Sequence, residues 1–114
     1  MPFGVDEMLL AALAMGATAA IGSTYNIAAP LYLRIFAAFQ QGDLAEARRL
    51  QQQSTLMVRV LRRYPIHSAM KHILKMRGVD CGRCRLPQPP MSGEQIESLE
   101  NDLSAIQFVE SFAQ

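Results

Sequence analysis

The segment 22–26, GSTYN, places three hydroxyl groups and one amide within five positions, between two apolar stretches. Small and polar residues in such a place usually form a turn. The hydroxyls of Ser23 and Thr24 therefore have two interpretations. They end a strand and its turn, or they belong to a ligand-binding surface, and the residues alone leave both interpretations open.

Asp6 and Glu7 form a pair of adjacent carboxylates directly before an apolar run that begins at Met8. Acidic side chains in the first turn of a helix are stabilised by the positive end of the helix dipole. A structural role is therefore enough to explain this pair, and a role in binding needs support from elsewhere in the sequence.

Cys81 and Cys84 form a single CxxC pair. A structural zinc ion needs four ligands, and no second cysteine pair is present. His67 and His72 would complete a site only if the chain folded back on itself, and a zinc ion shared by two chains is a further alternative. A redox pair at this spacing usually lies on a thioredoxin-like βαβ unit, which this pattern lacks. We interpret both as ordinary thiols and expect no metal and no cofactor.

The hydrophobic spacing predicts a predominantly α-helical chain of about five helices with one possible short strand. A first helix follows Asp6 as its N-cap, and its stripe consists of Met8, Leu9, Ala12 and Leu13. A second helix is expected over residues 29–41. Capping boxes at 43–46 and 92–95 begin two more helices, and a fourth covers residues 66–77. The stretch 17–24, ATAAIGST, is a buried strand or a linker.

The charge is unevenly distributed, although the formal net charge is only +1. Ten basic residues and one acid lie between Arg48 and Arg85, whereas five acids and no bases follow from Ser92 onward. We interpret these segments as helix faces that attract each other or are solvated. Nucleic-acid binding is not expected, because aromatic residues are not interleaved and no known motif is present.

Nothing in the sequence resembles a targeting or membrane segment. The apolar run over residues 8–21 is shorter than the ~20 residues that cross a bilayer, and acids rather than bases precede it. Two cysteines in such a chain fit a reducing compartment. We therefore expect a cytoplasmic protein that does not bind a membrane.

Residues 4–26, GVDEMLLAALAMGATAAIGSTYN, resemble the C-terminal third of the N-acetylneuraminate lyase family, a branch of the aldolase superfamily that includes dihydrodipicolinate synthase. The resemblance continues through RIFAAFQQGDLAEARRLQ and AMKHILKMRGVDCGRCRLPQPPMS, and so spans almost the whole chain. The G-x-D-E and G-S-T-Y-N motifs are its most specific parts.

The resemblance implies an eight-stranded β/α barrel with a C-terminal helical extension. Residues 1–42 would be the end of the barrel and residues 43–114 the extension, within one domain. Family members split N-acetylneuraminate into N-acetylmannosamine and pyruvate, through a lysine that forms a Schiff base and a tyrosine that shuttles protons. By this resemblance Gly4, Asp6, Glu7 and Ser23 match positions that contact the sugar.

The sequence departs from the family by its length, since such a barrel needs ~250 residues. The strands that carry the lysine and the proton-shuttling tyrosine have no counterpart in it. Lys71 and Lys75 fall in the extension, and Tyr25 belongs to GSTYN, so none of them inherits either role. Without the amine no iminium can act as electron sink, and we expect no catalytic residue and no activity from the chain alone.

The alternative is a non-catalytic helical module that associates with itself. The expected helix over residues 29–41 is apolar on more than one side, with Leu31, Leu33, Ile35, Phe36 and Phe39. Such a helix is buried or lies at an interface. We therefore expect a dimer or higher oligomer with Leu33 or Phe36 in the contact, and sialic acid as a ligand only in a complete barrel.

Overall fold

The computed structural model describes residues 2–108 and consists there of one 3-10 helix and five α-helices. They are η1 (Asp6–Met8), α1 (Leu9–Ala14), α2 (Tyr25–Gln40), α3 (Leu44–Leu61), α4 (Ile66–Met76) and α5 (Gly93–Ala105). The predicted fold class, a predominantly helical chain with about five helices, is confirmed.

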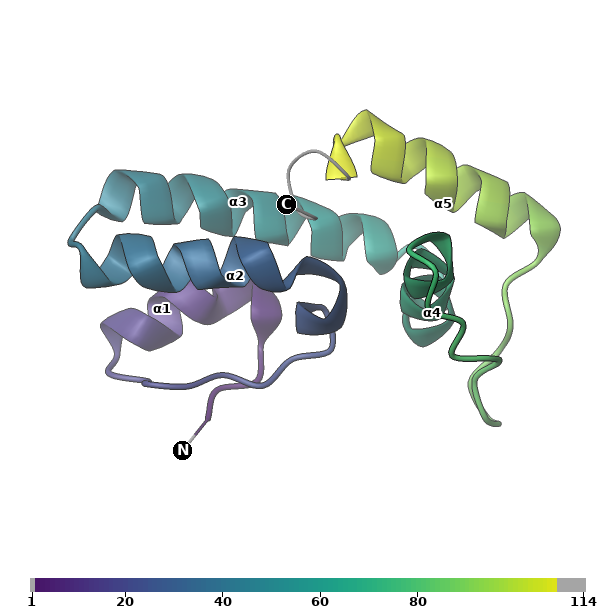
Figure 1. Cartoon of the computed structure of the whole chain (residues 1–114), viewed down its shortest axis with the longest axis horizontal. Coiled ribbons are helices and arrows are strands. Elements are labelled where there is room, and N and C mark those ends of the chain that lie inside the picture. The colour runs from purple at the N-terminus through teal and green to yellow at the C-terminus, as the bar shows by residue number, and fades with distance from the viewer. Residues whose placement is uncertain (1, 109–114) are drawn as a thin grey trace.

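Helices α2 and α3 lie side by side, and α1 packs beneath them (Figure 1). The turn between α2 and α3 is short because Gly42 adopts a positive φ of 76°, a conformation that glycine reaches without steric cost. Helices α4 and α5 form the opposite end of the molecule (Figure 1).

Helix α2 begins earlier than predicted. It starts at Tyr25 instead of residue 29, and its first turn is separated from the rest by a kink at Ala28, where φ is −143°. Pro30 lies just beyond the kink. A proline inside a helix lacks one N–H donor and clashes with the preceding turn, so the chain takes one helical turn before the kink and continues after it.

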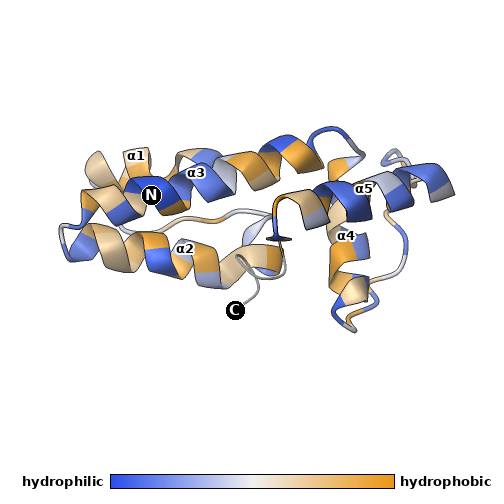
Figure 2. Ribbon diagram, turned by 90° about the horizontal axis from the view of Figure 1, so that it is seen from above, coloured by the Kyte–Doolittle hydropathy of each residue, from blue (hydrophilic) through white to orange (hydrophobic). Residues whose placement is uncertain are grey.

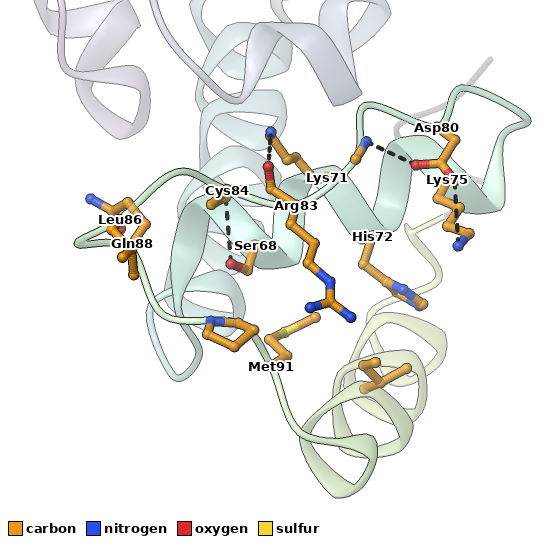
Figure 3. Close-up of a pocket in the computed structure, with 13 residues that line it drawn as sticks. Ser68, Lys71, His72, Lys75, Asp80, Arg83, Cys84, Leu86, Gln88 and Met91 are labelled. Carbon is orange, nitrogen blue, oxygen red and sulfur yellow. Dashed lines mark hydrogen bonds and ion pairs between the residues drawn. The ribbon is translucent and has the colours of Figure 1, made fainter.

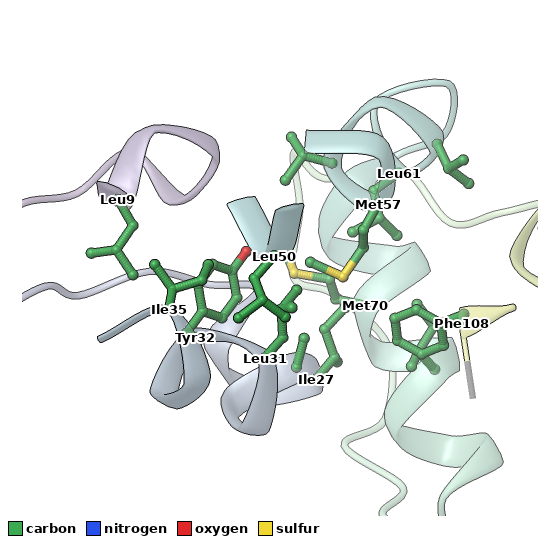
Figure 4. Close-up of a cluster of buried hydrophobic side chains, with 14 of the residues drawn as sticks. Leu9, Ile27, Leu31, Tyr32, Ile35, Leu50, Met57, Leu61, Met70 and Phe108 are labelled. Carbon is green, nitrogen blue, oxygen red and sulfur yellow. The ribbon is translucent and has the colours of Figure 1, made fainter. Parts of the chain in front are cut away.

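The hydrophobic core is continuous from α1 to α5. Figure 2 shows hydrophilic and hydrophobic residues alternating along α3 and α5, as expected for helices that bury one face. The close-up of the core shows Leu31, Ile35 and Leu50 meeting between α2 and α3, with Met57 and Met70 extending the cluster toward α4 (Figure 4). The division at residue 42 stays a prediction.

Two details of the first helix were predicted wrongly. Asp6 does not cap the helix, since Val5 holds the N-cap position and no side-chain capping bond forms. Met8 is 52% exposed and so lies off the buried stripe, whereas Leu9, Ala12 and Leu13 are buried. The break between a 3-10 turn and α1 rotates Met8 away from the core.

The capping boxes differ in outcome. Ser92 and Gln95 exchange both hydrogen bonds of a capping box. Asp43 accepts from the Glu46 amide at 3.0 Å, but no reciprocal bond is formed. Glu46 instead accepts from Arg49 at 2.7 Å, because that arginine lies one turn away on the same face.

Candidate functional site

Two loops meet at one edge of the molecule because a pair of extended segments runs parallel there. Phe3 and Ala20 form an isolated parallel bridge, with bonds from Phe3 N to Ala19 O (3.0 Å) and from Ile21 N to Phe3 O (2.8 Å). The stretch predicted as a strand or a linker is therefore a linker with a single bridge among the described residues. Since the segments are parallel, the loops that follow them, 4–7 and 22–24, lie at the same edge.

Asp6 joins the two loops. Its side chain is buried, with the residue only 7% exposed, and its Oδ2 atom accepts two hydrogen bonds from Thr24. One comes from the backbone amide at 3.0 Å and the other from the hydroxyl at 2.5 Å. A buried carboxylate is costly unless it is hydrogen-bonded, and these two charge-assisted bonds offset that cost.

The hydrogen bonds continue from Thr24 into the helical core. The Thr24 hydroxyl lies 2.7 Å from the Tyr32 hydroxyl on α2, which lies 2.9 Å from the Ser54 hydroxyl on α3. Counting protons sets the direction. Thr24 gives its one hydroxyl proton to Asp6, so Tyr32 donates to Thr24. The Ser54 hydroxyl then donates to Tyr32 or, at 3.4 Å, to the backbone carbonyl of Asp6. We call these four residues, Ser54, Tyr32, Thr24 and Asp6, the hydroxyl chain.

The electrostatics of Tyr32 agree with this direction. Burial, helped by the charges of Asp6 and Glu7 and opposed by the bonds to Ser54 and Thr24, raises the pKa of Tyr32 to about 12. The phenol is therefore protonated near neutral pH and available as a donor. Chains of hydroxyls that point toward one anion polarise each other and strengthen each bond.

Gly22 is the residue that lets the loops approach so closely. A Cβ atom at this position would overlap the Asp6 carboxylate, since all three of its nearest heavy atoms would belong to that group. Glycine is the one residue without a Cβ, so the contact between Asp6 and the loop 22–24 depends on it.

The predicted sugar-contacting residues lie at this edge with different exposures. Asp6 is buried, Glu7 is half-buried, and Gly4 and Ser23 are exposed. Glu7 accepts from Arg62 at 2.6 Å, a contact that holds its carboxylate toward α3. The structure thus brings the two segments together, and contact of these four residues with a sugar stays a prediction.

Sequence reasoning missed the inner part of the hydroxyl chain. Thr24 was considered as the end of a strand and turn or as part of a ligand-binding surface, but not as a link to the core, and Tyr32 and Ser54 were not considered at all. A signal was nevertheless present in α3, because Ser54 interrupts the apolar stripe of Leu50, Met57 and Leu61 and is fully buried. A hydroxyl on a buried stripe needs a partner in the core.

Tyr25 lies beside the hydroxyl chain. Its ring packs against Tyr32 with 4.2 Å between the ring centroids and 53° between their planes. Its hydroxyl is buried without a hydrogen-bond partner among residues 2–108. Burial, and then the charge of Asp6, raise the pKa of Tyr25 well above its usual value.

A hollow lies at the other end of the molecule, between α4, α5 and the connector that joins them, residues 77–92 (Figure 3). Its volume is about 750 Å³, and cationic side chains line it beside apolar ones. Lys71 donates to the carbonyls of Cys81 (3.3 Å) and Arg83 (3.0 Å), and Ser68 lies 3.5 Å from the Cys84 sulfur. These contacts fix the connector on α4.

Both cysteines of this connector are free thiols, Cys81 exposed and Cys84 half-buried. Within residues 2–108 no three side chains of the metal-binding types gather closely enough to hold an ion. His67 is exposed, and His72 lies 2.9 Å from Glu100. The hollow is therefore a feature of the helical extension, separate from the edge where the two loops meet.

The family follows from comparison with known proteins. Residues 3–106 match the Dihydrodipicolinate synthetase family, and the chain belongs to that family. Lyases of N-acetylneuraminate are among the similar proteins within it. The chain is 40% identical over 84 residues to the N-acetylneuraminate lyase of Actinobacillus pleuropneumoniae, a match that covers 74% of this chain and 29% of that protein.

Solved structures show the same likeness. The N-acetylneuraminate lyase of Proteus mirabilis matches with a TM-score of 0.85 and 40% identity, over 94% of this chain and 36% of that one. The sialic acid aldolase of Aliivibrio salmonicida matches with a TM-score of 0.87 and 37% identity, over 97% of this chain and 37% of that one. The chain thus spans about a third of these relatives, as predicted for the end of a barrel and its helical extension.

Among residues 2–108, no helix is both long enough and apolar enough to span a membrane.

Proposed function

We propose that this chain forms the sugar-binding wall of an aldolase that splits N-acetylneuraminate into N-acetylmannosamine and pyruvate. The observation that carries the proposal is the meeting of loops 4–7 and 22–24 at one edge, in a chain similar to N-acetylneuraminate lyases. In barrel enzymes the active site lies at the carboxyl ends of the strands, and both loops here directly follow the two segments of the parallel bridge.

The exposed polar groups of this wall suit a polyhydroxylated ligand. The Glu7 carboxylate accepts hydrogen bonds from sugar hydroxyls, and the Ser23 hydroxyl can donate or accept. Asp6 acts from behind them, because both bonds to its Oδ2 atom come from Thr24. The wall binds and orients the sugar, while the amine that forms the Schiff base comes from another part of the barrel.

The chain by itself is proposed to be inactive. Its lysines, Lys71 and Lys75, lie on α4 beside the hollow between α4 and α5, away from the two loops. Incubation with pyruvate and borohydride should therefore leave both lysines unmodified, as measured by intact mass. Trapped pyruvate on either residue, or release of N-acetylmannosamine above a no-enzyme control, would contradict this proposal.

The sugar-binding role is tested by restoring a barrel. This chain would replace the matching C-terminal third of the Proteus mirabilis lyase, and release of N-acetylmannosamine would be measured. We expect a folded chimera with activity, a strongly raised KM in the Glu7→Gln and Ser23→Ala variants, and no change in the Glu94→Gln control at the start of α5. A folded and active chimera whose KM is unchanged in the Glu7→Gln and Ser23→Ala variants would refute the sugar-binding role.

The second candidate function, self-association, is favoured by the apolar surface. Leu33, on the largely apolar helix α2, is 67% exposed, and covering such a side chain with a second copy would remove apolar surface from water. Phe36 is half-buried against the core, so its replacement would disturb folding as well as contacts. Leu33→Asp is the cleaner test, and it should convert a dimer or higher oligomer into a folded monomer in sedimentation. A wild-type monomer at micromolar concentration would contradict self-association.

A further inference from the structure

The hydroxyl chain connects parts of the molecule that are far apart in sequence. Asp6 lies in η1 and Thr24 directly precedes α2. Tyr32 lies within α2, and Ser54 lies within α3. The bonds span 18, 8 and 22 positions of the sequence. The chain thus ties the two loops to the pair of helices that forms the centre of the core.

Beyond the bridge, the hydroxyl chain is what joins the loops. The bridge bonds use the backbone of Phe3, Ala19 and Ile21. Among the described residues, the hydrogen bonds between segments 4–8 and 22–24 are the two from Thr24 to Asp6. The direct link between the loops past the bridge is therefore one carboxylate and one threonine. Helix α3 also holds the first loop, because Ser54 Oγ and Gln51 Nε2 each lie 3.4 Å from the Asp6 carbonyl oxygen.

Anchored and available residues alternate in both loops. Buried Asp6 is followed by half-buried Glu7, and exposed Ser23 is followed by buried Thr24. Each side chain proposed to face the sugar thus belongs to a residue next in sequence to a buried, hydrogen-bonded residue, Asp6 or Thr24, which we call its anchor. A shift of either anchor would move its neighbour, and misplacement of about 1 Å is enough to impair a polar site.

The inner members of the hydroxyl chain are unusual for core packing. Ser54 has no exposed surface and lies on a stripe otherwise made of leucine and methionine. An apolar residue would fill that position without the cost of burying a hydroxyl. A fully satisfied buried network instead fixes one arrangement of the groups that it joins.

We propose that Thr24, Tyr32 and Ser54 are positioning residues that hold the loops bearing Glu7 and Ser23 in the geometry for sugar binding. Tyr32 acts through Thr24, whereas Ser54 acts through Tyr32 and through the backbone carbonyl of Asp6, and neither residue touches the substrate. The inference rests on the proposed function for its purpose, but the positioning itself is measurable without any ligand.

The first experiment measures amide hydrogen exchange by NMR in the full chain. Tyr32→Phe and Ser54→Ala each remove one hydroxyl and leave the backbone intact. We expect exchange at the hydrogen-bonded amides of Met8 and Thr24 to become about tenfold faster than in the wild type, while exchange in the core of α3 stays unchanged. Exchange that rises equally at all sites, or does not change, would overturn the proposal.

Two matched pairs separate positioning from general stability. Thr24→Val keeps the shape of the side chain but loses its hydroxyl, whereas Thr24→Ser keeps the hydroxyl and should restore slow exchange. Tyr64→Phe removes another phenol that bonds a carboxylate, Asp102, at 2.7 Å. This control should lower stability slightly without changing exchange in the two loops. Faster loop exchange in Tyr64→Phe would equally overturn the proposal.

The chimeric lyase provides the readout with sugar. Tyr32→Phe should raise KM for N-acetylneuraminate several-fold with kcat nearly unchanged, because the interaction lost is one of binding. A chimera that folds but has no activity would refute the proposed function, while the exchange data still decide the positioning role. An active chimera with an unaltered KM in Tyr32→Phe would refute the positioning role alone.

Discussion

At the end formed by α1, α2 and α3, a buried carboxylate and three hydroxyls join two loops to the helices, whereas at the end formed by α4 and α5 the polar contacts lie near the surface. There His72 pairs with Glu100, Arg63 with Asp102, and Lys75 with Asp80. Both partners of the last pair have more than 60% of their side chains exposed. Exposed ion pairs contribute little to stability.

The difference shows that polar groups have two roles in this chain: buried ones fix the arrangement of the loops, and exposed ones orient a helix on the surface. Buried hydrogen bonds are costly to break, so the first end has one preferred arrangement of its loops. The basic and acidic segments of the sequence do attract each other, since Arg63 meets Asp102 of α5. Such surface contacts orient α5, and the adjoining connector is held mainly by Lys71 and Ser68.

The largest effect should come from Gly22→Ala. The new methyl group would overlap the Asp6 carboxylate and force it away from Thr24. Overpacking and the loss of charged hydrogen bonds together should cost about 4 kcal/mol of unfolding free energy. The control is Gly93→Ala in α5, where no atom lies within 4 Å of the added carbon. Chemical denaturation showing equal stability for the two variants would contradict the close approach at Gly22.

Leu31→Ala should have the next largest effect. Leu31 is fully buried between α2 and α3 (Figure 4), and truncation of such a leucine costs about 3 kcal/mol. Leu86→Ala is the matched change at the other end, where the side chain is 90% exposed in the connector. The Leu86→Ala variant should unfold at the same denaturant concentration as the wild type. A loss of unfolding free energy similar to that of Leu31→Ala would instead mean that the connector packs against another surface.

Alkaline pH should weaken the first end through Tyr32. The folded protein raises the pKa of Tyr32 to about 12, so the fold favours the neutral phenol. This contribution is complete below pH 10 and is lost as the pH rises through 12, with a total of about 3 kcal/mol. The measurement is the difference in unfolding free energy between wild type and Tyr32→Phe from pH 9 to pH 12. A difference that does not depend on pH would contradict the buried phenol.

The helices could be predicted because their signals are local. Periodic apolar residues, Gly42 and the Ser92 capping box each act within a few positions of the sequence. The start of α2 was missed because Pro30 usually marks the first turn of a helix, whereas here one turn precedes it and a kink at Ala28 accommodates the ring.

The candidate site was predictable only in its outer residues. Asp6, Glu7 and Ser23 were found through motifs, and nothing in those motifs indicates that Asp6 is buried behind the others. Tyr32 and Ser54, the inner members of the hydroxyl chain, come from two helices. The contact between their hydroxyls therefore depends on how α2 packs against α3. Such long-range contacts leave only indirect signs in the sequence, like the serine on the apolar stripe of α3.

The smallest effect should come from the ion pair between Arg63 and Asp102. Their atoms lie 3.3 Å apart and the Arg63 side chain is 64% exposed, so the coupling should be below about 1 kcal/mol. A double-mutant cycle of Arg63→Ala and Asp102→Asn would measure it, and raised salt should weaken it further because exposed charges are screened. Asp102 also accepts from Tyr64 at 2.7 Å, so Asp102→Asn alone loses more than Arg63→Ala. A coupling above about 2 kcal/mol that resists salt would show that this end, too, is fixed by desolvated polar contacts, and would remove the contrast between the two ends.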